Sequence, residues 1–265
     1  MKKKNLRFVC LLVIILLGKV SYSQTLKGIK FLDEYTSSDS AMVFVFADGN
    51  VKGLVSNTEN NQTSTTGAIG ISVIKKNITW NASINIASTI DTLNSDFGSI
   101  ILNPSSGKQF TSGLLEFYAR NLIKKYNIGF HGYASGSSSN WSKNDTTKAA
   151  SIFGLGALMT YDIVNSSTGE NEIAFGFEFG PSYRGVFGNI SNDEQFYENI
   201  LGTKGQHFLG LEGGLNIRFN HITAGIQGYL LYDVEQGHKI DGVTSFQITG
   251  GISISGSIFK SKVKL

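Results

Sequence analysis

Charged side chains, proline and cysteine are all scarce in this chain of 265 residues. Charged residues make up 16% of the sequence, well below the roughly 25% of an ordinary soluble domain. A single cysteine excludes a disulfide scaffold, and a hydrophobic share of 41% argues against a disordered chain. The same composition argues against a collagen and against a coiled coil.

Long apolar runs are scarce as well. After residue 23 no run approaches the roughly 20 residues that a membrane-spanning helix needs. The strongly apolar run at 8–17 follows a cationic stretch at 1–7, and small residues precede Gln24, so residues 1–23 are predicted to be a secretory signal peptide. Cys10 lies in the middle of its apolar core, where lipid attachment is not expected, so the mature chain is predicted to have no thiol chemistry.

The basic character of the sequence comes from this first segment. The whole chain has a formal charge of +3, with 23 basic and 20 acidic residues. Residues 1–23 hold five of the basic residues and none of the acidic ones, so the remainder has 18 against 20 and a net charge of about −2. A nucleic-acid partner is therefore not expected, because its phosphates attract a basic surface.

What the remaining sequence has in abundance is strict alternation, the two-residue period of a β-strand with unlike faces. In residues 172–187, phenylalanines such as Phe175, Phe177 and Phe179 share one face, and small or polar residues such as Glu178 share the other. The same period recurs at 78–90, 207–219, 222–235 and 245–258, and less regularly at 67–75, 111–123, 126–136 and 149–163.

Three features favour a membrane barrel over a soluble β-sandwich, which also alternates. The expected strands reach or exceed the 9–11 residues that cross a bilayer. Short connections, such as residues 75–77, alternate with long polar ones at 48–66, 91–110, 137–148, 188–205 and 237–242. Aromatic residues gather near strand ends, as in the girdles of membrane barrels: Trp80, Tyr126, Trp141, Tyr161, Tyr183, Phe187, Phe219 and Tyr232.

The signal segment ending before Gln24, the alternating strands and the bias toward glycine and aromatic residues resemble an outer-membrane β-barrel protein of the Bacteroidota type. The resemblance covers residues 41–259 and is one of pattern, without a diagnostic motif. It implies a Gram-negative cell, a place in the cell outer membrane, contact with outer-membrane lipid and insertion by the barrel-assembly machinery. Members commonly end on an aromatic residue, whereas here Phe259 is followed by six further residues.

The predicted fold is therefore all-β, a transmembrane antiparallel up-and-down β-barrel of about ten strands. Eight and twelve strands stay open, because Asp48-Gly49-Asn50 is a strong hairpin signal that would make residues 51–56 a separate strand. The expected organisation is a signal peptide at 1–23, an N-terminal periplasmic segment at 24–40, the barrel at 41–259 and a C-terminal tail at 260–265.

If the apolar face meets lipid, the opposite face fills the lumen. The candidate site is the set of charged residues on that face, which we expect to form either an internal network of ion pairs or a selectivity layer. These residues are Glu116, Arg120, His131, Asp162, Glu178, Arg184, Glu212 and Arg218.

Signs of catalysis are weak. No His-x-Ser pair of the outer-membrane lipase kind occurs, and only His221-x-Thr223 approaches one. Four scattered histidines give no metal signature, and no glycine motif forms a nucleotide loop, so neither a metal nor a cofactor is expected. The polar stretch at 188–205 is predicted to hold a short helix that begins at Asn192 or Asp193.

These observations predict a non-enzymatic, porin-like protein that is either structural or passes small solutes through a narrow polar lumen. The alternatives are a binding or adhesion protein that holds an extracellular ligand with its long loops, a barrel hydrolase at the outer leaflet and, for the fold, a secreted soluble β-sandwich.

Overall fold

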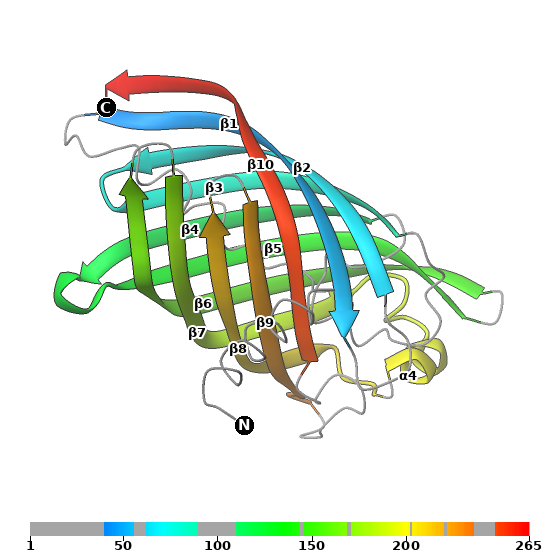
Figure 1. Cartoon of the computed structure of the whole chain (residues 1–265). Coiled ribbons are helices and arrows are strands. Elements are labelled where there is room, and N and C mark those ends of the chain that lie inside the picture. The colour runs from blue at the N-terminus through cyan, green and yellow to red at the C-terminus, as the bar shows by residue number, and fades with distance from the viewer. Residues whose placement is uncertain are drawn as a thin grey trace, which may run out of the picture.

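The computed structural model describes residues 40–55, 62–89, 110–143, 146–168, 171–201, 203–219, 222–235 and 247–264. The predicted signal peptide and the segment at 24–39 lie outside this part of the chain. The described part contains ten long strands and two short helical elements (Figure 1). The strands are β1 (Ser40–Val55), β2 (Gln62–Lys75), β3 (Ile78–Thr89), β4 (Phe110–Ile123), β5 (Ile128–Lys143), β6 (Thr146–Thr168), β7 (Asn171–Phe187), β8 (His207–Phe219), β9 (Ile222–Asp233) and β10 (Gln247–Lys264). The helical elements are η2 (Lys124–Tyr126) and α4 (Glu194–Leu201).

The strands form a closed antiparallel barrel. Each strand pairs with its neighbours in the chain, and β1 closes the sheet by pairing with β10 over their whole lengths. The predicted up-and-down barrel is therefore confirmed, and the alternative of a soluble β-sandwich is wrong. Among the described residues, no helix has the length and apolar character needed to span a membrane.

The pairing register fixes the shape of the barrel. Following paired residues once around the wall from Ala41, with the β1–β2 register extended by one residue, returns to β1 at Val55, a stagger of 14 residues. At about 3.3 Å per residue along a strand and about 4.8 Å between strands, this stagger gives a tilt of about 44° and a backbone radius of about 10–11 Å. A wall of that radius leaves an interior that facing long side chains can fill.

The two faces of the wall are inverted relative to a soluble protein. On β8, Leu211 and Leu215 are exposed on the outside, whereas Glu212 and Asn216 are buried inside. The outward apolar positions of β8 run from Leu209 to Phe219, which at the tilt above corresponds to a belt about 24 Å tall, close to the roughly 25 Å of membrane barrels. The exposed apolar face is thus of the right height to contact a bilayer.

Several strand limits differ from those predicted from the sequence. β1 continues through Asp48-Gly49-Asn50, which pairs with β2 and β10 instead of forming a hairpin. β5 and β6 extend to Lys143 and from Thr146, so most of the predicted loop at 137–148 is strand. The predicted tail at 260–265 is also wrong, because β10 runs to Lys264 and pairs with the beginning of β1. In each case a neighbouring strand supplies hydrogen-bond partners that a single sequence window does not show.

The doubly apolar character of residues 41–47 has a local cause. Inside the barrel, Met42, Phe44 and Phe46 of β1 pack with Ile74 of β2 in a buried apolar cluster close to the short-turn end. The outward residues of the same stretch belong to the outer wall. This corner of the lumen is apolar, whereas the middle of the lumen is polar.

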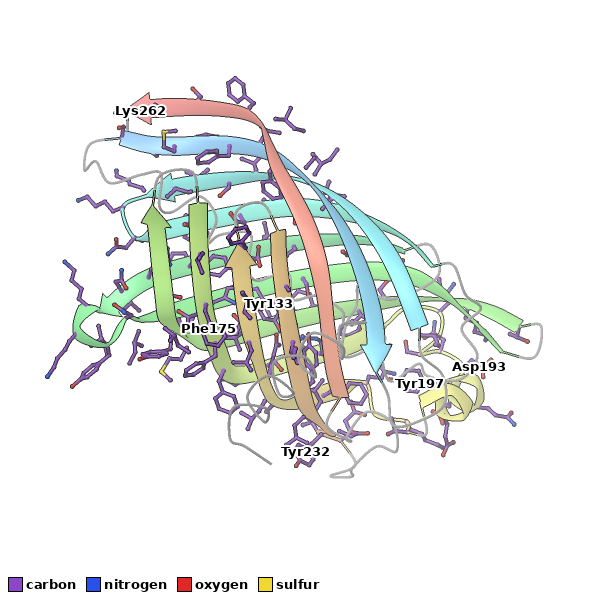
Figure 2. All side chains as sticks on the ribbon, viewed as in Figure 1. Tyr133, Phe175, Asp193, Tyr197, Tyr232 and Lys262 are labelled. Atoms are coloured by element: carbon purple, nitrogen blue, oxygen red, sulfur yellow. The ribbon has the colours of Figure 1, made fainter. Side chains whose placement is uncertain are left out.

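The long-loop end of the barrel is capped on one side by α4. The predicted helix in this connection is present, and the backbone N–H of Tyr197 donates to the carbonyl of Asp193 at 2.9 Å. Tyr197 belongs to α4 and is labelled in Figure 2; its buried hydroxyl donates to the Gly205 carbonyl at 2.6 Å. Lys148 on β6 forms an ion pair with Asp193, the residue before α4, which links the beginning of the helix to the barrel wall.

Candidate functional site

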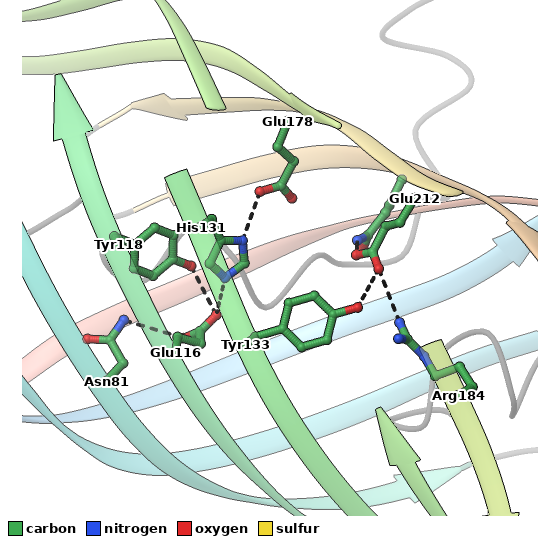
Figure 3. A network of polar contacts seen from close by, with 9 residues as sticks. Asn81, Glu116, Tyr118, His131, Tyr133, Glu178, Arg184 and Glu212 are labelled. Carbon is green, nitrogen blue, oxygen red and sulfur yellow. Dashed lines mark hydrogen bonds and ion pairs between the residues drawn. The ribbon is translucent and has the colours of Figure 1, made fainter. Parts of the chain in front are cut away.

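The candidate site is a layer of polar side chains across the middle of the lumen; its charged residues come from β4, β5, β7 and β8, and β3 and β9 supply further partners (Figure 3). Alternation turns these side chains inward, and the register brings them to similar heights. Tyr118 pairs with His131 across β4 and β5, and Glu178 and Glu212 occupy positions two residues apart in the register of β7 and β8. All of the charged members of this layer are almost completely buried.

One half of the layer is the His131 clamp, which consists of Glu116, Tyr118, His131 and Glu178. The imidazole Nδ1 lies 3.2 Å from Glu178 Oε2, and its Nε2 lies 3.7 Å from Glu116 Oε1. The ring of Tyr118 stacks on the imidazole with a centroid distance of 4.2 Å, and its hydroxyl donates to Glu116 at 3.0 Å. Asn81 adds a second donor to Glu116, at 3.3 Å. Both ring nitrogens therefore face carboxylates in a site without solvent access.

The other half is the Glu212 knot, in which donors from three strands converge on one carboxylate. Arg184 Nη2 lies 3.2 Å from Glu212 Oε2, and the Tyr133 hydroxyl and the Gln227 amide also donate to Glu212. The Arg184 guanidinium lies over the rings of Tyr133 and Tyr229, at 5.4 and 5.7 Å from their centroids. A buried charge with this many partners is stabilised in a low-dielectric interior.

Glycine makes room for this layer. The ring of Tyr133 lies over Gly156, its cross-strand neighbour on β6, where a Cβ atom would overlap the ring. A Cβ atom on Gly154 would similarly lie 3.3 Å from the Arg184 side chain. The glycines that the sequence places on the polar face thus leave space for aromatic and guanidinium groups from opposite strands.

A third ion pair lies nearer the short-turn end. Arg120 binds Asp162 through Nη2 at 2.8 Å and through Nε at 3.1 Å. Between this pair and Glu178 is a small cavity of about 30 Å³ that reaches Asn216, a volume that suits one or two water molecules. The Oδ1 atom of Asn216 is buried without a hydrogen-bond partner, as expected for a group that a water molecule would satisfy.

The structure brings seven of the eight predicted charged residues into three adjoining groups. They are the His131 clamp (Glu116, His131, Glu178), the Glu212 knot (Arg184, Glu212) and the pair Arg120–Asp162. The backbone of Arg218 pairs with Ala174 and Thr223, but its side chain lies outside the described part. Within these three groups, four carboxylates thus face two guanidinium groups and one imidazole.

Sequence reasoning missed the aromatic members, Tyr118, Tyr133 and Tyr229. Tyr229 lies on the polar face of a clearly alternating stretch, so an inward position was predictable, whereas the role of its ring as a surface for Arg184 was not. Tyr118 and Tyr133 lie on β4 and β5, where alternation is less regular and β4 has a register shift after Ala119. Aromatic residues on the inner face of a membrane barrel are a sequence signal for such a layer, since contact with lipid does not account for them there.

No group of three or more metal-ligating side chains occurs among the described residues. The contacts described for the candidate site are ion pairs and hydrogen bonds, which fill the lumen at its middle. Its chemistry is the mutual neutralisation of buried charges.

The paired strands, the exposed apolar belt and the ion-paired interior together define a β-barrel of the outer-membrane kind. Neither a protein-family model nor a curated protein matches the chain. Among solved structures, it is similar to a Salmonella typhi OmpF in complex with daunomycin, with 10% sequence identity over 86% of this chain and 99% of that chain and a TM-score of 0.24. Because this TM-score is low, the fold rests on the strand pairing and not on this likeness.

Proposed function

We propose that the protein is a non-enzymatic β-barrel of the outer membrane of a Gram-negative cell of the Bacteroidota type, with a lumen that is closed in its resting state. The observation that carries this proposal is the inverted wall, with exposed leucine and phenylalanine outside and buried, paired charges inside. Outer-membrane lipid covers the apolar belt, and the barrel-assembly machinery inserts the chain. The barrel serves as a rigid membrane support for α4 and the described part of the connection between β7 and β8.

Closure of the lumen follows from the size of the wall and from what fills it. A backbone radius of about 10–11 Å leaves no wide aqueous channel once long side chains point inward from opposite walls. The charged groups of the His131 clamp and of the Glu212 knot are each buried to at least 96%, so none of them is open to solvent. A structural role therefore has more support than free diffusion of solutes.

The test combines cell fractionation with heat-dependent gel migration. We expect the full chain in the outer-membrane fraction, and we expect faster migration of the unheated folded form than of the heated form. In planar bilayers at neutral pH, the folded protein should show no steady conductance. A protein recovered from the soluble fraction, without a migration shift, would contradict the proposal.

A second candidate function is passage of small solutes through the lumen. It is favoured by the small cavity between Arg120, Asp162 and Glu178, which reaches the His131 clamp from the short-turn end. Excess carboxylates would make such a passage prefer cations. Steady cation-selective currents at neutral pH that change in Glu178→Gln would support this function over a closed barrel.

The two remaining alternatives, a protein that binds a ligand with its long loops and a hydrolase at the outer leaflet, have less structural support. α4 presents Glu194 and Glu198 to solvent, and both form ion pairs with Lys204, so a loop ligand would have to compete with these contacts. A hydrolase at the outer leaflet is tested by lipase and protease assays on the purified protein in detergent, where we expect no activity.

A further inference from the structure

The two ends of the barrel differ in how their lysines are partnered. At the long-loop end, both lysines with described side chains are ion-paired, Lys148 with Asp193 and Lys204 with glutamates of α4. At the short-turn end, the lysines with described side chains form no ion pair with any described carboxylate. We call this second group the lysine rim; it consists of Lys75, Lys76, Lys124, Lys125 and Lys262.

The lysine rim is continuous around part of the wall. Lys262, which Figure 2 shows at the end of β10, pairs with Met42 on β1. Met42 pairs in turn with Ile74, which directly precedes Lys75 and the turn between β2 and β3. That turn contacts the end of β4 through a backbone hydrogen bond of 2.8 Å, and β4 leads directly into η2. The five lysines therefore lie along one arc of the short-turn end, from β10 to η2.

The sequence around this end keeps the charge positive. Seven lysines and two glutamates, a formal excess of +5, occur in the short connections with their flanking residues and at the end of β10, that is, in residues 75–77, 123–127, 165–172, 219–222 and 260–264. Asp162 also lies toward this end, but its carboxylate is already paired with Arg120. The positive charge of the lysine rim is therefore not neutralised by the described part of the chain.

A row of aromatic side chains lies on the outer wall beside the lysine rim. Trp80 on β3 is 58% exposed, and its ring centroid lies 4.5 Å from that of Phe117 on β4. The ring of Phe117 lies 6.3 Å from that of Phe130 on β5. In η2, the ring centroid of the exposed Tyr126 lies 5.2 Å from Lys125 Nζ. Because aromatic rings of membrane proteins gather at the level of the lipid head groups, the lysines lie where head-group phosphates are found.

The arrangement suits phosphate groups spread over a surface. A lysine ammonium is a compact charge with three donors, and it binds phosphate as a point charge. The five lysines are distributed over β2, η2 and β10 and do not converge on one point, so they do not form a site for a single free phosphate ion. Their long aliphatic stems can follow the apolar wall while the ammonium groups stay in the polar layer.

We propose that the lysine rim is a binding surface for anionic phospholipid, in which the ammonium groups bind head-group phosphates and the aromatic row lies against the adjoining acyl chains. The proposal rests on the membrane barrel of the proposed function and adds the class of lipid that one end of the barrel selects. A lysine near an anionic lipid surface is attracted by a free energy that corresponds to about fivefold in binding.

The test is quenching of tryptophan fluorescence by brominated lipid in phosphatidylcholine vesicles that hold the full chain. The chain has two tryptophans, Trp80 beside the lysine rim and Trp141 near the long-loop end of β5, so Trp141→Phe leaves Trp80 as the reporter. Brominated phosphatidylglycerol is compared with brominated phosphatidylcholine in equal amounts. At about 0.01 M salt, where the Debye length is about 30 Å, we expect phosphatidylglycerol to be preferred at Trp80 by about fivefold. At about 1 M salt, where the Debye length is about 3 Å, the preference should disappear.

Variants of the Trp141→Phe chain locate the preference. A rim variant that lacks four of the lysines should lose it at low salt; its substitutions are Lys75→Gln, Lys76→Gln, Lys124→Gln and Lys125→Gln. The matched control, Lys148→Gln with Lys204→Gln, removes lysines from the opposite end and should keep the preference. Heat-dependent migration shows which variants are folded barrels. If the rim variant does not fold, the salt dependence of the Trp141→Phe chain decides the question.

Each contrary result has a distinct meaning. Equal quenching by the two brominated lipids at low salt would overturn the binding surface while leaving the membrane barrel intact, as would a preference that persists at high salt or in the folded rim variant. A preference that inorganic phosphate abolishes at constant ionic strength would show that the lysines bind free phosphate and not lipid. Quenching by neither lipid would place Trp80 outside the bilayer and would overturn the proposed function itself.

Discussion

At the scale of single residues, the protein keeps charges in its interior by surrounding each one with partners. Glu212 accepts from a guanidinium, a phenol and an amide, and Glu116 accepts from a phenol and an amide. Side chains of this kind are almost never buried in water-soluble proteins unless they are paired. Here the polar lumen takes the place of a hydrophobic core. Removal of one partner therefore leaves a charge that is still buried but is no longer compensated.

Replacement of Arg184 by methionine tests this dependence. The side chains of Arg184 and Glu212 are exposed by only 3% and 2%, so the variant leaves a carboxylate buried without its counter-ion. We expect the free energy of unfolding to fall by about 3–5 kcal/mol, measured by guanidinium denaturation in detergent. The double variant Arg184→Met with Glu212→Leu should regain most of this loss. A single variant that loses less than about 1 kcal/mol would show that the ion pair is not needed.

Tyr197 carries a pH dependence outside the membrane-spanning wall. Burial raises the pKa of Tyr197, and the nearby carboxylates of Asp233 and Glu235 raise it further. With a pKa raised in the folded state, the stabilisation is present below the ordinary tyrosine value of about 10 and is lost as the pH rises above it. We expect α4 to become sensitive to protease above that pH. Tyr197→Phe removes both the ionisation and the bond to Gly205, and should be sensitive already at pH 8.

At the scale of elements, alternation determines which residues of a strand point to the lumen and which point outward. Glycine on the lumen face leaves space for a large side chain from a neighbouring strand. The polar face predicted for β7 and β8 points into the lumen as expected, because a period of two leaves no other choice once one face is apolar. The limits of β1, β5 and β10 were not predictable, because they depend on the partner strand. The distances within the His131 clamp were not predictable either, since they follow from the stagger of the whole barrel.

Gly156 offers a test of cross-strand packing. We expect Gly156→Val to displace the ring of Tyr133 and to break its hydrogen bond to Glu212, at a cost of about 1–3 kcal/mol in unfolding free energy. Gly113 on β4 has open space where its Cβ atom would lie, so Gly113→Val is the matched control with little expected change. Equal effects of the two substitutions would exclude a specific role for Gly156.

The last residues of β10 are part of the wall. Lys260–Lys264 pair with the beginning of β1, from Ser40 to Phe44, and Figure 1 shows the two ends side by side. A chain that ends at Phe259 leaves this stretch of β1 without its β10 partner. We expect the truncated chain to lose the fast-migrating folded form on unheated gels. Retention of that form after truncation would mean that residues 260–264 are dispensable.

At the scale of the molecule, the barrel is arranged for an apolar surrounding. Large hydrophobic side chains such as Ile84 and Leu115 are each 61% exposed, whereas the ionised groups are buried. The sequence predicts this inversion only in part, because a β-sandwich has the same alternation with its faces reversed. Strand length and the alternation of short and long connections distinguish the two.

A charge on the outer wall should therefore cost more at the middle of the belt than at its edge. Leu215 lies within the outward row of β8, whereas Val234 lies beyond the end of β9, at the long-loop end. We expect Leu215→Arg to destabilise the folded barrel in lipid vesicles by about 2–4 kcal/mol, and Val234→Arg by about 1 kcal/mol or less. Similar costs at both positions would place the membrane elsewhere on the molecule.

The closing seam between β1 and β10 also sets an order of events. Its pairs join residues 193 to 224 positions apart, from Val55 with Ile248 to Ser40 with Lys264. The first strand to be made is thus the last to find its second neighbour, and its edge stays unpaired until the final residues of the chain are delivered. Folding of the wall can spread from hairpin to hairpin, but closure waits for the completed chain. A helper that shields the edge of β1 during this interval would act on the single contact that the barrel cannot make early.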